Sequence, residues 1–113
     1  MFQITPKRVA MMYHLLRGLP PFSRWSLPET VDVRFHTPCR RDVYGEHCHK
    51  RGGHIVTVST DNHGHFDTAL RTLAHEMIHM AQAEAKEMTT HGPGWDRRAE
   101  AVGRALGWDW RAL

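Results

Sequence analysis

Two histidines one helical turn apart, with a glutamate beside the first, are the residues best suited to chemistry in this sequence. They form the stretch His75-Glu76-Met77-Ile78-His79, an H-E-x-x-H motif. On an α-helix, positions i and i+4 lie about 40° apart around the axis, so both imidazoles can reach one metal ion. Glu76 can then hold a carboxylate near the open position of the metal without ligating it. The motif therefore predicts a catalytic centre that binds one zinc ion, Zn2+.

The residues around the motif have the periodicity of an amphipathic helix. From Thr68 to Met88 the apolar side chains fall on one arc, which only Glu84 interrupts. The arc comprises Leu70, Leu73, Ala74, Met77, Ile78, Met80, Ala81, Ala85 and Met88, and the opposite face carries Thr72, His75, His79, Gln82 and Lys86. We therefore expect the apolar side in the core and the histidines toward a cleft, with Asp67 as the helix cap.

The third zinc ligand has two candidates, because a catalytic zinc usually takes three protein ligands and one water. The metzincin spacing would place a histidine where this chain has Ala85, which excludes that class. Glu100 stands at the gluzincin spacing, and His91 lies on the Gly-Pro-Gly bend after the motif helix. We prefer His91, because a rigid bend fixes a ligand well and Glu100 has Arg97 and Arg104 at ion-pair spacings.

Other segments predict the elements that must position this helix. Thr5 before Pro6 predicts a helix start, and Gly18 its end. Strands are expected where Val31, Val33 and Phe35 alternate with polar residues, at Arg41–Tyr44, at Glu46–Lys50 and at His54–Ser59, with a hairpin turn at Gly52-Gly53. A last helix is expected from about Trp95 to Leu106, with Trp108 and Trp110 packing back on the domain. Together these segments predict an α+β fold: an N-terminal helix, a small, mostly antiparallel sheet of about three to four strands, the motif helix and a C-terminal helix.

Length and composition indicate one ordinary globular domain, residues 1–113. Apolar residues make up 41% and charged residues 24% of the chain. No run of about 18 apolar residues is present to span a membrane, and the first residues lack a secretion signal, so a cytoplasmic location is expected. The formal net charge of +3 permits contact with nucleic acid without establishing it. Nothing in the sequence indicates an oligomeric state.

A few further residues could take part in metal binding. Cys39 and Cys48 are expected to be free thiols in a reducing compartment, although with His47 and His49 they could form a second metal site. The spacing of the two cysteines does not match a C-x-x-C pattern, which argues against that site. His63 and His65, on the polar loop before the motif helix, could line the cleft or ligate, but a loop histidine is usually just exposed.

Two groups of residues together resemble the SprT-like/Spartan metalloprotease domain. They are Leu73 to His79, and His91-Gly92-Pro93-Gly94-Trp95, which is similar to that family's H-G-x-x-F or H-G-x-x-W pattern. The similarity extends over roughly Val31 to Leu106. It implies a zincin-like fold, zinc held by His75, His79 and His91, and Glu76 as the catalytic acid/base. In the eukaryotic branch it also implies DNA-dependent cleavage of proteins crosslinked to DNA.

These features predict a metal-assisted peptide hydrolase acting on a protein or peptide. The strand from Ile55 to Ser59 is expected to be an edge strand that binds an extended peptide, with Ile55, Val56 and Thr57 lining the cleft. Tyr44, His63 and His65 are candidates for stabilising the oxyanion. Two alternatives stay open: a hydrolase acting on another bond, and a non-enzymatic, zinc-stabilised module that binds DNA or protein. The second alternative requires a fourth protein ligand, from His63, His65 or a cysteine.

Overall fold

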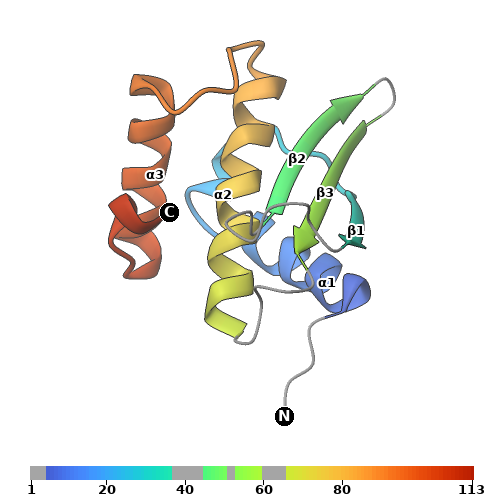
Figure 1. Cartoon of the computed structure of the whole chain (residues 1–113). Helices are drawn as coiled ribbons and strands as arrows, with labels where there is room; N and C mark the ends of the chain where they lie inside the picture. The colour runs from blue at the N-terminus through green and yellow to red at the C-terminus, as the bar shows by residue number, and fades with distance from the viewer. Residues whose placement is uncertain (1–4, 37–44, 51–52, 60–65) are drawn as a thin grey trace.

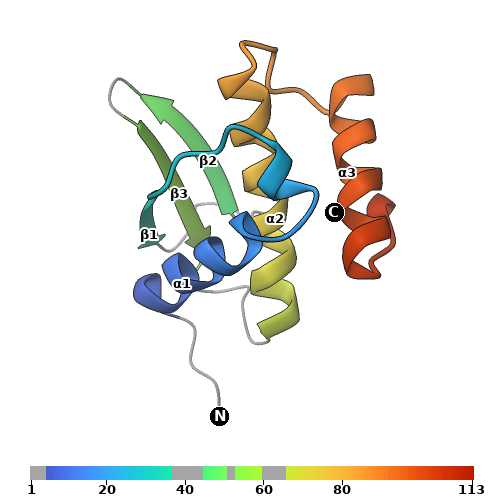
Figure 2. The ribbon, with the colours of Figure 1, turned by 180° about the vertical axis from the view of Figure 1, so that it is seen from behind.

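The structure is a computed structural model that describes residues 5–36, 45–50, 53–59 and 66–113. In chain order, the elements within these ranges are α1 (Pro6–Arg17), the 3-10 helix η1 (Phe22–Arg24), β1 (Asp32–His36), β2 (Gly45–Lys50), β3 (Gly53–Ser59), α2 (Phe66–Glu84), α3 (Pro93–Leu106) and the 3-10 helix η2 (Trp110–Ala112). The long helix α2 lies between the sheet and α3 (Figure 1). The opposite view shows α1, which contacts both β1 and α2 (Figure 2). No helix in these ranges is long and apolar enough to cross a membrane.

The sheet is mixed, and this corrects the expected fold class. Its strand order is β1-β3-β2; β1 runs parallel to β3, with Val33 opposite Val56, and β2 runs antiparallel to β3, with Glu46 opposite Thr57. A mostly antiparallel sheet is therefore wrong, because one of the two pairings is parallel. Alternation along β1 predicts a strand but not its partner, and the chain between β1 and β3 is long enough to bring the second strand back in the same direction. The strand expected at Arg41–Tyr44 lies outside the described residues.

The strand β3 is central, not an edge. From Ile55 to Val58 it is paired with β1 on one side and with β2 on the other. Its backbone therefore has no free edge there for an extended peptide, and the expected strand addition along Ile55–Ser59 is wrong. Within the described part of the chain the edge strands are β1 and β2, and β2 lies on the side of the sheet next to α2 (Figure 1).

The helix α2 supplies the largest share of the core. Its buried apolar residues are Ala69, Leu73, Ala74, Met77, Ile78, Met80 and Ala81, which confirms the middle of the expected apolar arc. Two polar residues of the same helix are buried as well: Glu76 is 4% exposed and Gln82 is 1% exposed. A buried polar side chain is costly unless it has a partner.

The end of α2 lies four residues earlier than the apolar arc suggests. The backbone N–H of Glu87 donates to the carbonyl of Gln82, and the N–H of Lys86 donates to Ala83. Lys86 has a φ of 58°, so these bonds form a helix-ending Schellman motif with a lysine at the left-handed position that glycine usually takes. Met88 is consequently outside the helix and 77% exposed. The chain then turns toward α3.

The other two helices begin and end at the residues that their sequences indicate. In α1, the Thr5 hydroxyl accepts a hydrogen bond from the backbone N–H of Arg8, and Pro6 occupies the first helical turn. In α3, Pro93 is again the first residue, and Gly107 with φ 80° ends the helix. The final helix is thus confirmed, beginning two residues before the expected Trp95.

The residues after α3 fold back on it, as expected for Trp108 and Trp110, which pack against the core. The close approach is possible because α3 has a glycine at position 103. A β-carbon on Gly103 would lie 2.6 Å from the backbone oxygen of Trp108 and 3.1 Å from the β-carbon of Trp110. Gly18, at the end of α1, has its nearest such neighbour, the Leu15 oxygen, at 3.6 Å.

We predict that Gly103→Ala destabilises the protein by about 1–3 kcal/mol, because the new methyl group forces the tail away from α3. Gly18→Ala is the matched control, and we expect it to be neutral or slightly stabilising, since its site has room and φ is −80°. Urea unfolding of the two variants measures the difference. Equal stability of the two variants would contradict the packing described for the tail.

Candidate metal centre

The helix α2 places His75 and His79 on the same face, one turn apart. Their ring centroids are 5.0 Å apart, as i,i+4 geometry dictates. Glu76, the next residue after His75, is buried in the same helix. The spatial relationship that the H-E-x-x-H spacing predicts for the two histidines is therefore present.

The bend between α2 and α3 brings His91 to this pair. Its ring centroid lies 5.0 Å from each of the other two imidazoles, and one ligand nitrogen from each ring lies within 4.8 Å of the others. The Nε2 atoms of His79 and His91 are 3.1 Å apart. In a tetrahedral site with Zn–N bonds of about 2.1 Å, ligand nitrogens lie about 3.4 Å apart, so this donor set fits a zinc ion.

The rival third ligand, Glu100, belongs to another part of the surface. Its carboxylate pairs with Arg104 at 2.9 Å, one turn along α3, and it is not part of the histidine cluster. Within the described residues the cluster has three members, which is the number of protein ligands typical of a catalytic zinc site.

Several of the other expected site residues cannot be placed. Tyr44, His63, His65 and Cys39 lie outside the described residues. Cys48 and the cleft candidates Val56 and Thr57 lie on strands β2 and β3, where the structure gives the backbone path. Their expected roles stay predictions.

The indole ring of Trp95 packs against all three histidines of the cluster, a contact that the sequence analysis missed. The Trp95 ring lies 4.3 Å from His75, 4.7 Å from His79 and 4.5 Å from His91, measured between centroids, and it is 5% exposed. Sequence periodicity placed Trp95 on the buried side of the last helix without indicating what it touches. The signal that could have found the contact is its spacing, one helical turn beyond His91 and at the start of α3.

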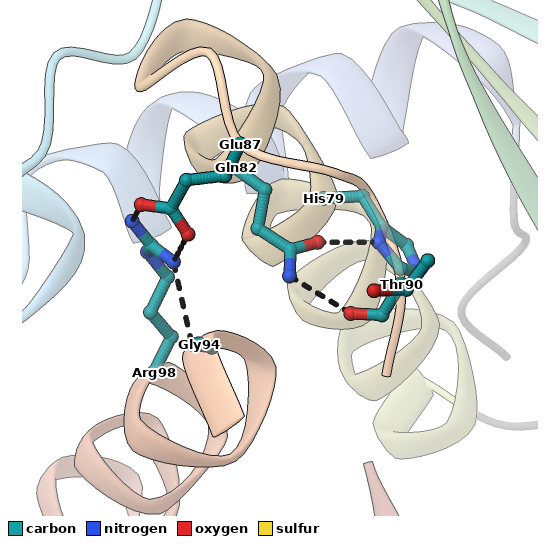
Figure 3. A network of polar contacts seen from close by, with 6 residues as sticks. All are labelled: His79, Gln82, Glu87, Thr90, Gly94 and Arg98. Atoms are coloured by element: carbon teal, nitrogen blue, oxygen red, sulfur yellow. Dashed lines mark hydrogen bonds and ion pairs between the residues drawn. The ribbon is translucent and has the colours of Figure 1, made fainter. Parts of the chain in front are cut away.

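Gln82 lies beside His79, on the face of α2 where the sequence analysis expected it, but its burial and its contacts were not predicted. Its side-chain oxygen Oε1 lies 2.9 Å from Nδ1 of His79, and its Nε2 donates to the Thr90 carbonyl at 2.9 Å (Figure 3). The amide therefore spans from one histidine of the cluster to the residue just before another. Its position three residues after His79, at helical contact distance, was the available signal.

A second polar link holds the same bend to α3. The Arg98 guanidinium donates to both carboxylate oxygens of Glu87, at 2.9 and 2.8 Å, and to the Gly94 carbonyl at 3.3 Å (Figure 3). The paired geometry is the strong, two-pronged form of this interaction. Because Glu87 precedes His91 and Gly94 follows it, the link fixes the chain on both sides of the histidine.

The surroundings keep the α2 histidines neutral, which is the form that binds metal. Burial, followed by the neighbouring rings of His79 and His91, lowers the pKa of His75 to about 4, while a hydrogen bond to the Leu113 backbone acts in the opposite direction. Burial also lowers the pKa of His79, against the effect of its bond to Gln82 and together with the effect of His91.

We predict that the metal-free protein loses stability as the pH falls from about 6.5 toward 4. In this range the unfolded chain protonates His75 and the folded protein does not, so acid favours the unfolded state. The slope for one such group approaches about 1.4 kcal/mol per pH unit. Urea unfolding between pH 7.5 and 5 measures it.

The control for this prediction is His75→Asn, which removes the titrating group but keeps a polar side chain. Its free energy of unfolding should depend less steeply on pH between 6.5 and 5. Staying above pH 5 avoids the carboxylate of Glu87, whose pKa the hydrogen bond to Arg98 holds below its usual value. Identical pH slopes for the two proteins would refute the assignment of the effect to His75.

Comparison with known proteins identifies the family. Searches of curated proteins and of solved structures found no match. A family model described as the SprT-like family matches residues 22–110. The matched region includes the H-E-x-x-H helix, the bend with His91, and Trp95. The match confirms the resemblance inferred from the sequence. The chain belongs to the SprT-like family.

Proposed function

We propose that this protein is a zinc-dependent metallopeptidase. The observation that carries the proposal is the convergence of three imidazoles, with ligand atoms within 4.8 Å, beside a buried glutamate in a member of the SprT-like family. The three histidines are His75, His79 and His91. Three is the number of protein ligands that a catalytic zinc site usually has, whereas a fourth protein ligand, from His63, His65 or a cysteine, would favour the structural alternative.

Each residue has a separate role in the proposed reaction. The histidines hold the metal through neutral nitrogens, and Glu76 takes a proton from the attacking water and delivers it to the leaving amine. Bound zinc supplies Lewis acidity, which promotes deprotonation of water near neutral pH and polarises the scissile carbonyl. Glu76 suits the role of proton carrier because it follows His75 directly on α2 and is not one of the three grouped donors.

For the substrate we propose an extended segment of protein, bound along β2. This strand is the edge next to α2 in the described sheet, so its outer backbone groups are the ones that a peptide near the histidines can pair with. DNA-associated proteins are the finer proposal, supported by the family resemblance and by the formal net charge of +3.

We predict that Glu76→Gln abolishes peptide cleavage, with a loss of at least about 10²-fold, while zinc binding persists. The amide keeps the size of the side chain but cannot take the proton. The measurement is zinc content together with cleavage of casein, with and without single-stranded DNA.

His91→Ala is the matched variant that should lose zinc as well as cleavage. Cleavage by Glu76→Gln at the native rate would disprove the role given to Glu76. Full zinc affinity in His91→Ala would disprove the three-histidine site. Stimulation of native cleavage by DNA would support the finer proposal, and its absence would leave peptide hydrolysis without a role for DNA.

A further inference from the structure

We propose that Gln82 is a positioning residue of the metal centre: one side-chain amide fixes the tautomer of His79 and holds the bend that carries His91. The functional role inferred for Gln82 rests on the proposed metal site. The hydrogen-bond geometry that carries it involves protein atoms only.

The first step is that Gln82 is buried and has a partner at each end of its amide. Its side chain is 1% exposed, and both Oε1 and Nε2 lie 2.9 Å from their partners, His79 Nδ1 and the Thr90 carbonyl (Figure 3). A buried amide without such partners would destabilise the folded protein. The two bonds are therefore both needed, and they set the position of the amide.

The second step is the direction of the amide. A backbone carbonyl can only accept a hydrogen bond, so the NH2 end of Gln82 has to face Thr90. The reverse orientation would place two acceptor oxygens against each other. The oxygen Oε1 therefore faces His79, and the Thr90 carbonyl determines which end of the amide the histidine meets.

The third step is the tautomer. Because Oε1 accepts, Nδ1 of His79 has to carry the hydrogen, and a neutral imidazole has only one. Its Nε2 is then left with a free lone pair, and this is the atom that lies 3.1 Å from Nε2 of His91. The nitrogen that faces the cluster is thus held in the form that can ligate.

The fourth step is the bend itself. Thr90 directly precedes His91, and Gln82 lies in the last turns of α2, so the Nε2–carbonyl bond ties the third histidine to the helix that carries the other two. The Glu87–Arg98 ion pair also ties the bend but does so through α3. The chain thus offers its own control: Glu87 stabilises the bend, whereas Gln82 stabilises the bend and acts on His79.

The experiment compares Gln82→Leu, Gln82→Glu and Glu87→Gln with the native protein. The first readout is the His79 tautomer, from the nitrogen-15 shifts of its imidazole in the zinc-free protein at pH 8, assigned by comparison with His79→Ala. The second is zinc affinity, measured by competition with a chromophoric chelator. Thermal unfolding establishes that each variant is folded.

We expect the native protein to have His79 protonated on Nδ1. Gln82→Leu should give a mixture of tautomers and a zinc affinity about 10–100-fold lower. Gln82→Glu should keep the tautomer, because its carboxylate accepts from Nδ1. It should recover only part of the affinity, because a carboxylate has no hydrogen to donate to the Thr90 carbonyl. Glu87→Gln should keep the tautomer and lower the affinity by no more than about fivefold, the scale of a surface ion pair.

Three results would overturn the proposal. They are a native His79 protonated on Nε2, a Gln82→Leu protein that keeps both the tautomer and the native zinc affinity, and a Glu87→Gln protein that loses as much affinity as Gln82→Leu. The native tautomer decides the question even if Gln82→Leu does not fold. A native protein that binds no zinc would defeat the proposed metal site, and the tautomer measurement would still stand, since it needs neither metal nor substrate.

Discussion

Holding the ligand nitrogens of three imidazoles within 4.8 Å of one another is the constraint on which the rest of this structure depends. Rings this close cannot all be protonated without strong repulsion, and burial of His75 and His79 favours their neutral forms. Two of the rings come together through helical geometry alone. The third has to be brought back by the chain, and the segment from the end of α2 to the start of α3 is built to do that.

Each of several residues in that segment restricts the path of the chain in a different way. Lys86, in a left-handed conformation, ends α2 and turns the chain. Gly92 and Pro93 start α3 immediately after His91, so the helix constrains the backbone on the C-terminal side of the histidine. Trp95, on the first turn of α3, then places its indole against all three imidazoles. The bend is therefore fixed by backbone conformation, by hydrogen bonds and by aromatic packing at once.

How much of this follows from the sequence differs between the site and the sheet. The histidine cluster was largely predictable, because the helical repeat relates His75 to His79 and the Gly-Pro-Gly sequence after His91 predicts a bend. The burial of Gln82 was missed because a helical wheel cannot show that the chain beyond α2 folds back over this residue. The parallel pairing of β1 with β3 was missed because alternation along a strand contains no information about its neighbour. Met88 fits the apolar periodicity, yet a lysine at a helix end stopped the helix first, and lysine is not a residue that signals such a stop.

All three histidines of the cluster lie on one uninterrupted stretch of chain, from α2 to the residue before the Gly-Pro start of α3. The strands contribute no member to the cluster as far as the structure describes them. In the proposed enzyme, the residues that would hold the ion and the strand proposed to bind the substrate therefore belong to separate parts of the polypeptide. Under that proposal, substitutions on the outer edge of β2 would change which substrate is preferred without touching the three histidines.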